Sequence, residues 1–253
     1  SGSPTPCSSL PAAASSPSHT IACATFTRTA SRCQSFAPPV ESMAYCVKVR
    51  AASLRPAFAA SIARNRATSV SHCVSVGVDG SVFTVSEKTD KLMKYDASGK
   101  GSVVMEGILG HSILARPDGS LYVTSNGDKP HGPGSVWLIK DGKKTEVDRG
   151  IKFATGMAYR PDQWLLSVGE GHSKWVYSYQ INDDGTLGNK ERFFHLHVAD
   201  WDDDAGAECI CYSLEGRQFL ATKSGIQISA DDGPTQVILT VPDRARVTGV
   251  AIG

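Results

Sequence analysis

Residues 155–185, TGMAYRPDQWLLSVGEGHSKWVYSYQINDDG, decide the fold of this chain. They read as a strand, a Pro-Asp turn, a second strand, a short polar loop, a third strand and an acidic-glycine turn. In the third strand, Trp175, Tyr177 and Tyr179 occupy every second position, which is the period of a β-strand. The stretch therefore predicts a unit of short β-strands joined by tight turns.

Related copies of this unit occur before and after it. The first turn recurs as VDG, PDG, PDQ and LEG, with its acid at Asp79, Asp118, Asp162 and Glu215. One apolar strand precedes each of these turns, and a second, a third and a fourth strand follow it. The acids are 39, 44 and 53 residues apart. Four strands in each unit at this spacing are typical of propeller blades.

The repeat predicts an all-β fold, a β-propeller, with four recognisable blades and the start of a fifth at residues 247–253. A β-sandwich also has many short strands, but it does not repeat the same turn chemistry at a fixed place in each unit. A closed propeller ring leaves no long strand edges exposed. Four units and a fragment are not expected to complete such a ring. We therefore expect an incomplete propeller, as in a fragment or a truncated gene product.

The composition divides the chain into residues 1–70 and 71–253. The first part holds seven Lys and Arg and one acid, a net charge of about +6, and the second part carries about −5. Gly2 is the only glycine before residue 71, and five of the seven cysteines lie in the first 73 residues without a CxxC pair. We interpret residues 1–70 as a low-complexity leader, either disordered or mistranslated, and residues 71–253 as the partial propeller. A targeting segment and a divergent structured part are the alternatives.

Several kinds of site are not expected. No run approaches the roughly 18–20 apolar residues that a membrane span needs. The chain contains no GxSxG elbow and no HExxH helix, and residues 127–134 lack the strand–helix setting of a phosphate loop. We expect no nucleic-acid or membrane partner and a monomeric protein. Cys209 and Cys211 share one face of a predicted strand, where the simpler interpretation is a pair of buried apolar thiols.

The first strands predict a candidate site. Propellers bind ligands at the mouth of the central channel, which the innermost strands line. If the first strand of each unit is innermost, residues seven positions before each turn acid lie at one level of the channel. Those residues are His72, His111, Thr155 and Glu208, and the fifth copy adds Thr248. Two histidines, a carboxylate and hydroxyls at one level predict a metal site.

Competing interpretations apply to several of these residues. A histidine at the start of a strand is commonly a hydrogen-bonded surface residue. Glu208 is the stronger candidate, because a carboxylate beside apolar neighbours needs a partner or an ion. For His195 and His197, on one face of an outer strand, we expect exposure. The acidic residues of 200–204 are interpreted as a solvated loop, although their position ahead of Glu208 suits a cation.

Two runs also resemble a known family. GMAYRPDQWLLSVGEGHSKWVYSYQINDDGTLGN (156–189) and AGAECICYSLEGRQFLATKSGIQI (205–228) are similar to the senescence marker protein, gluconolactonase and luciferin-regenerating enzyme family, in particular its sugar lactone lactonase branch. The resemblance covers about residues 71–253. It implies a six-bladed propeller with one divalent cation, often calcium, at the channel mouth. A Glu of the first blade, Asn side chains and an Asp of an Ala-Asp-Gly run hold that cation in the family.

This sequence departs from the family pattern at the ligands. His111 and Thr155 stand where Asn is expected, Glu208 replaces the Asp, and no Glu is evident near His72. A set of histidines and a carboxylate favours zinc, iron or manganese over calcium. The leading hypothesis is a metal-dependent hydrolase of a sugar lactone or related cyclic ester, in which Glu208 is ligand and base. A small-molecule lactone or sugar acid would then be the partner.

Two rival hypotheses do not require hydrolysis. The first is a catalytically inactive propeller that binds a small molecule or a protein, with its metal site lost. The second is a propeller of the strictosidine-synthase or NHL type, which needs no metal. The fold alone does not separate these functions, because one architecture hosts many of them.

Overall fold

The computed structural model describes residues 43–46, 73–126, 133–230, 233–241 and 245–252. These residues form strands and no helix, so none of them belongs to a helical membrane span. The strands are β1 (Met43–Cys46), β2 (Cys73–Val76), β3 (Val82–Val85), β4 (Lys91–Tyr95), β5 (Gly101–Glu106), β6 (Ser112–Ala115), β7 (Leu121–Ser125), β8 (Pro133–Lys140), β9 (Lys143–Lys152), β10 (Ala154–Tyr159), β11 (Leu165–Glu170), β12 (Trp175–Ile181), β13 (Leu187–His195), β14 (Ile210–Tyr212), β15 (Gln218–Thr222), β16 (Gly225–Ser229), β17 (Thr235–Leu239) and β18 (Ala245–Gly249).

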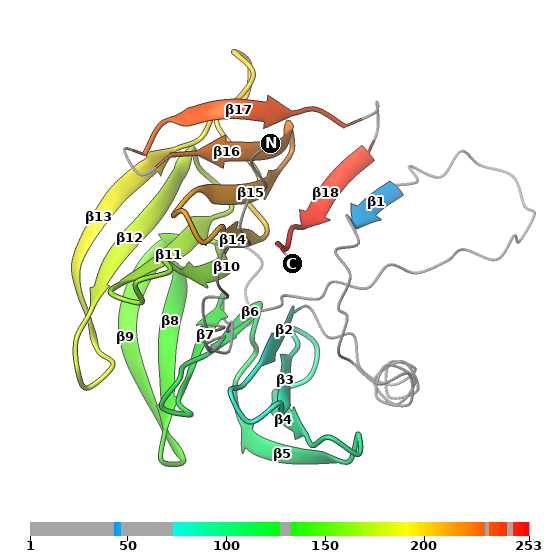
Figure 1. The fold of residues 1–253 in the computed structure, drawn as a ribbon, viewed down its shortest axis with the longest axis vertical. Coiled ribbons are helices and arrows are strands. Elements are labelled where there is room, and N and C mark those ends of the chain that lie inside the picture. Colours follow the sequence, from blue (N-terminus) through cyan, green and yellow to red (C-terminus); the bar gives the residue numbers. More distant parts are fainter. Residues whose placement is uncertain (1–42, 47–72, 127–132, 231–232, 242–244, 253) are drawn as a thin grey trace, which may run out of the picture.

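The strands build four antiparallel sheets, each with four strands in sequence order. We call them blade 1 (β2–β5), blade 2 (β6–β9), blade 3 (β10–β13) and blade 4 (β14–β17). The blades follow one another around an arc, and β18 lies beside blade 4 (Figure 1). This arrangement confirms the predicted propeller, with four blades and the first strand of a fifth in the described part of the chain.

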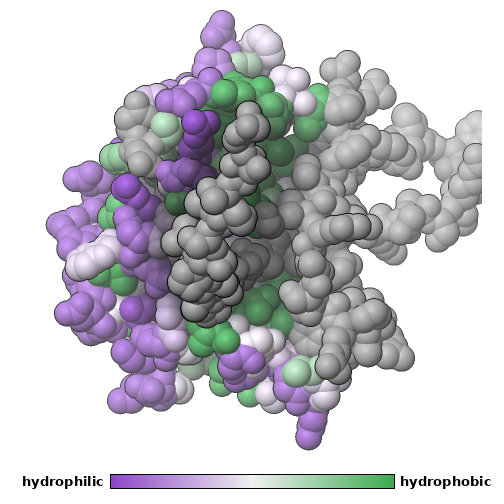
Figure 2. All heavy atoms as spheres, in the orientation of Figure 1, coloured by the Kyte–Doolittle hydropathy of each residue, from purple (hydrophilic) through white to green (hydrophobic). Residues whose placement is uncertain are grey.

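The first strand of each blade is the inner one, as predicted. β2 packs against β6, β6 against β10, and β10 against β14, so these strands surround a common axis. The fourth strands, β5, β9, β13 and β17, are largely exposed. Figure 2 shows the hydrophilic side chains gathered over this outer side, at the left of the view.

Apolar side chains from neighbouring blades fill the spaces between them. Leu92 and Val123 pack between blades 1 and 2, and both are fully buried. Between blades 2 and 3 the buried rings of Tyr122 and Tyr179 pack with aliphatic side chains, and Leu196 and Leu220 do the same between blades 3 and 4. Each such side chain contributes about 1.5–3 kcal/mol on burial, so the interblade layers hold the arc together.

The turns between first and second strands are closed by their acids. Asp79 accepts a hydrogen bond from the backbone N–H of Ser81 at 3.0 Å, and Asp118 accepts one from Ser120 at 3.0 Å. These are Asx turns, in which the side chain replaces a backbone acceptor. The repeated turn acids of the sequence are therefore structural residues.

One predicted outer strand differs from the structure. The apolar run of residues 192–198 predicts the fourth strand of blade 3, whereas β13 spans Leu187–His195. Beyond His195 the N–H of Leu196 still donates to the carbonyl of Lys174 at 2.7 Å, and its side chain lies in the core between blades 3 and 4. The side chain of Gln227 then binds both the N–H and the C=O of His197, at 2.8 and 2.7 Å.

Within residues 1–70 the structure describes only β1, which pairs in parallel with β18. The register joins Met43 to Ala245 and Tyr45 to Val247. The interpretation of residues 1–70 as a disordered or mistranslated leader otherwise lies outside the described residues and stays a prediction.

Candidate active site

One face of the propeller collects most of the predicted site residues. We call it the N-face, because the inner strands β2, β6, β10 and β14 begin there. The second strands end at the same face, since they are antiparallel to the first: Cys73 lies opposite Val85, and Ala154 opposite Glu170. Side chains that precede a first strand or follow a second strand therefore meet at the N-face.

His111 and Glu208 meet at this face. The imidazole Nε2 of His111 lies 3.8 Å from Oε2 of Glu208 and 4.0 Å from Oε1 of Glu87. The side chains of these three residues are 11%, 22% and 32% exposed, respectively. Two carboxylates beside one partly buried imidazole form a polar cluster with the groups of an acid–base or metal site.

Glycines let the backbone bring these residues together. A Cβ on Gly156 would lie 2.6 Å from the carbonyl oxygen of Glu208, so β10 and the start of blade 4 approach each other through that glycine. A Cβ on Gly110 would lie 2.6 Å from the Cβ of Val85. The N–H of Gly110 also donates to the carbonyl of Ser86 at 3.1 Å. Each contact positions the neighbouring member of the cluster.

Thr155 lies in β10, the inner strand that packs between β6 and β14. The residue is 1% exposed, and a Cβ on Gly169 would lie 2.5 Å from its Oγ1. This oxygen makes no hydrogen bond to any residue that the structure describes. A buried hydroxyl without a partner is unfavourable, which makes Thr155 a candidate for a ligand or a water. Asn126 is not a candidate for the same role, because its side-chain nitrogen donates to the carbonyl of Ala154 and its side-chain oxygen accepts the N–H of Ala154.

The predicted metal set stays a prediction. His72 lies outside the described residues. Thr248, of the fifth copy, lies in β18 and is partly buried. Across the described ranges, no group of three or more His, Cys, Asp and Glu side chains is arranged to hold a metal ion. His111 and Glu208 thus remain the two predicted residues that the structure brings into contact.

The acidic loop before Glu208 forms ion pairs with lysine side chains. Lys223 contacts Asp202 at 3.2 Å and Asp204 at 3.3 Å, and Lys174 contacts Asp203 at 3.2 Å. A backbone hydrogen bond from Asp204, followed by the contact with Lys223, lowers the pKa of Asp202. Asp200 and Asp203 are exposed, as predicted, whereas Asp202 and Asp204 are partly buried and are tied to blade 4 through Lys223.

Glu87 was missed by the sequence reasoning. It lies two residues after the end of β3, whereas the count along the sequence considered only residues that precede a first strand. The antiparallel pairing of β2 and β3 carries the end of β3 to the N-face. A charged residue just after the second strand of blade 1 was the available signal.

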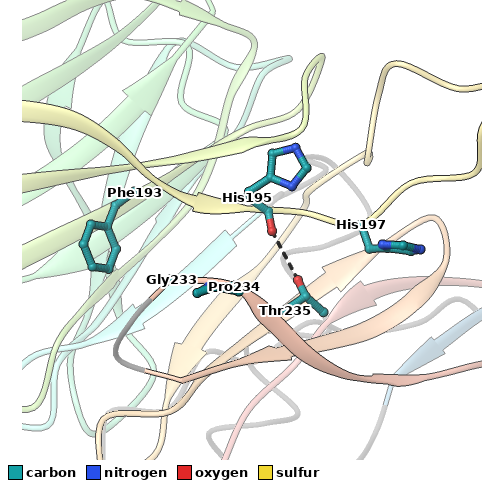
Figure 3. Close-up of a pocket in the computed structure, with 6 residues that line it drawn as sticks. All are labelled: Phe193, His195, His197, Gly233, Pro234 and Thr235. Carbon is teal, nitrogen blue, oxygen red and sulfur yellow. Dashed lines mark hydrogen bonds between the residues drawn. The ribbon is translucent and has the colours of Figure 1, made fainter.

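His195 and His197 are exposed, as predicted, and lie at the outer edge of blades 3 and 4. They line a hollow of about 380 Å³ together with Phe193, Gly233, Pro234 and Thr235 (Figure 3). The imidazole of His195 packs edge-on against Trp175, with 4.7 Å between ring centroids. In Figure 3 the two imidazoles point in different directions, so they do not form a chelating pair.

Four-stranded blades around a common axis define a β-propeller. Propellers of the lactonase type are among its structural neighbours. A gluconolactonase of Xanthomonas campestris superposes with a TM-score of 0.60 at 17% identity, over 70% of this chain and 64% of the other. The calcium-binding protein regucalcin of Agrobacterium tumefaciens gives a TM-score of 0.58 at 19% identity, over 70% and 61%. A luciferin-regenerating enzyme gives 0.56 at 16%, over 71% and 62%.

These likenesses establish the fold and confirm the resemblance drawn from the sequence at that level. The chain spans less than two thirds of the length of these three neighbours. No family model matches the chain, and no curated protein matches it.

Proposed function

We propose that the protein is a metal-dependent hydrolase of a sugar lactone or a similar cyclic ester. The observation that carries the proposal is the contact between His111 and Glu208 at the N-face, with Glu87 near the same imidazole nitrogen. The neighbours named as gluconolactonases support the choice of reaction. The proposed partner is a small-molecule lactone or sugar acid.

Hydrolysis of a lactone needs a base for the attacking water and stabilisation of the oxyanion. In the proposal, Glu208 accepts the proton of the water, because its carboxylate is partly exposed at the N-face and has an imidazole beside it. His111, Thr155 and His72 serve as ligands or substrate contacts. A bound divalent cation would polarise the lactone carbonyl and lower the pKa of bound water.

The donor chemistry fits a divalent cation. Imidazole and carboxylate suit zinc and manganese, whereas calcium takes oxygen ligands, which Glu87, Glu208 and the hydroxyl of Thr155 offer. Oγ1 of Thr155 is buried without a hydrogen-bond partner among the described residues, so a ligand that contacts it would satisfy it. The calcium-binding regucalcin makes calcium the ion suggested by the neighbours.

The test combines metal analysis with hydrolysis of a lactone panel. Wild type, Glu208→Ala and the control Glu106→Gln are purified, their metal content is measured, and acid release from glucono-δ-lactone and related lactones is followed. Glu106 is a suitable control because it pairs with Lys91 at 3.1 Å on an outer strand. We expect Glu208→Ala to lose activity by about 10²-fold or more, with the control unchanged.

Each contrary outcome has a definite meaning. If the wild type contains no metal and hydrolyses none of the lactones, the hypothesis of an enzyme is overturned. A propeller that binds a ligand without catalysis is then favoured. Hydrolysis that survives Glu208→Ala at full rate would overturn only the role of Glu208.

A further inference from the structure

A second imidazole–carboxylate pair lies at the N-face. Nδ1 of His172 is 3.3 Å from Oδ2 of Asp204. His172 stands in the loop between β11 and β12 of blade 3, and Asp204 in the connection from blade 3 to blade 4. No residue of this pair belongs to the set predicted from the sequence as metal ligands.

The backbone holds this pair together. The N–H of Ala205, next to Asp204, donates to the carbonyl of Ser173, next to His172, at 2.9 Å. Asp204 is fixed further by the N–H of Gly206 at 2.6 Å and by Lys223 at 3.3 Å. A carboxylate held in this way orients the imidazole through Nδ1.

One aromatic ring links the pair to the proposed site. Phe153 contacts His111 edge-on, with 5.5 Å between centroids, and His172 at 4.7 Å. Both imidazoles therefore flank the same ring. His172 is thereby placed beside the site that contains His111 and Glu208, with an apolar surface between them.

The backbone at Phe153 is strained. Its φ is 64°, a left-handed value that costs a bulky residue roughly 1–3 kcal/mol. The fully buried Glu170 stabilises this conformation by accepting the N–H of Lys152 at 2.7 Å. The N–H of Gly171 donates to the carbonyl of Phe153 at 2.7 Å. Strain held in place by dedicated hydrogen bonds is common where a side chain must be aimed at a ligand.

We propose that His172 is the general acid of the hydrolysis, that Asp204 positions it, and that Phe153 forms the apolar wall of the substrate site. This inference rests on the proposed lactonase function. Water forms a bond from its oxygen to the carbonyl carbon while Glu208 takes a proton from it. The bond between that carbon and the ring oxygen then breaks, and the ring oxygen takes a proton from the imidazolium of His172. The product is the open hydroxy acid.

The exposure of His172 suits this role. Its side chain is 42% exposed, so the imidazole regains a proton from solvent after each turnover. Proton donation to the leaving oxygen matters most when that oxygen is a poor leaving group. Glucono-δ-lactone expels an aliphatic alkoxide, whereas dihydrocoumarin expels a phenoxide, which leaves readily without an acid.

The experiment compares these two lactones for wild type, His172→Gln and Asp204→Asn. We expect His172→Gln to lower kcat for glucono-δ-lactone by at least 10-fold and kcat for dihydrocoumarin by less than about 3-fold. Asp204→Asn changes the rates in the same direction by a smaller factor. The control is His195→Gln, because His195 is also an exposed histidine packed 4.7 Å from an aromatic ring, and it leaves both rates unchanged.

The outcomes distinguish a failure of this inference from a failure of the proposed lactonase function. A wild type that hydrolyses neither lactone overturns the proposed function, and the assignment of His172 as general acid is then overturned as well. An active wild type whose two rates fall equally in His172→Gln shows a structural role and overturns the inference alone. Unchanged rates in a folded His172→Gln variant, verified by its thermal midpoint, overturn it as well.

Discussion

The imidazole Nε2 of His111 lies 3.8 Å from Oε2 of Glu208, although the two residues belong to blades that are not neighbours. His111 precedes β6 of blade 2, Glu208 precedes β14 of blade 4, and blade 3 lies between them. The contact therefore reaches past the inner strand of blade 3. It depends on the packing of β6, β10 and β14 around one axis, so any change in that packing changes the candidate site.

Metal binding should stabilise the protein through these two residues. A ligand that binds only the folded state adds about 2.7 kcal/mol at 100 times its Kd. We expect calcium, zinc or manganese to raise the thermal midpoint of wild type, and His111→Gln and Glu208→Gln to lose most of that rise. Glu106→Gln, on the exposed edge, keeps it. A full metal-dependent rise in both site variants would rule out this pair as ligands.

The close approach at Gly156 predicts a strong effect of one methyl group. In Gly156→Ala the new Cβ would lie 2.6 Å from the carbonyl oxygen of Glu208 and 2.8 Å from the Cα of Cys209. Both are backbone atoms, so the inner strands must separate. We expect a loss of about 2 kcal/mol or more in unfolding free energy and a loss of activity.

Gly188→Ala is the matched control for that change. The nearest atoms to its Cβ belong to the side chain of Asn182, at 3.7 and 3.9 Å, which is ordinary contact. Denaturant unfolding of both variants checks the prediction. Equal stability of the two would show that β10 and the start of blade 4 have room to relax.

Sequence periodicity was sufficient to predict which residues of the inner strands lie at one level, but it did not predict the positions of the loop residues. Counting back from the turn acids placed His111 and Glu208 at one level, because each first strand runs from the N-face to a turn that repeats in every blade. Glu87, Phe153 and His172 lie in connections whose length varies from blade to blade. Their meeting at the N-face follows from strand pairing and from the backbone conformation of Phe153, which no sequence pattern encodes.

One turn of blade 3 departs from its copies in a way that stability measurements can detect. Gly80 and Gly119 occupy the left-handed position of their turns, with φ of 77° and 84°, whereas Gln163 holds φ of 61° at the equivalent place. Each of the three N–H groups closes the same hydrogen bond, which for Gln163 reaches Arg160 at 2.8 Å. A side chain in this region costs roughly 1–2 kcal/mol.

Gln163→Gly should therefore stabilise the protein by about 0.5–1 kcal/mol, since the relief of strain exceeds the extra freedom of glycine in the unfolded chain. The reverse change, Gly119→Gln, should destabilise it by about 1–2 kcal/mol, because open space surrounds Gly119 and only its φ opposes the side chain. Thermal unfolding of both variants is the measurement. A lower midpoint for Gln163→Gly would mean that the glutamine side chain makes a compensating contact.

Burial makes a defined prediction for the thiols near Glu208. Cys209 is buried in an apolar cluster with Val247, as predicted, and Cys211 packs against that cluster while partly buried. Burial, followed by the charge of Cys209, raises the pKa of Cys211 to about 12. The thiolate is the reactive form, so at pH 8 about one Cys211 in ten thousand is reactive, against about a quarter of free thiols.

We expect native Cys211 to resist iodoacetamide at pH 8 and to react fully in denaturant, as measured by mass spectrometry of the peptide that contains it. Rapid modification of the native protein would show that this cluster opens to solvent, and the start of blade 4 with Glu208 would then be mobile rather than fixed.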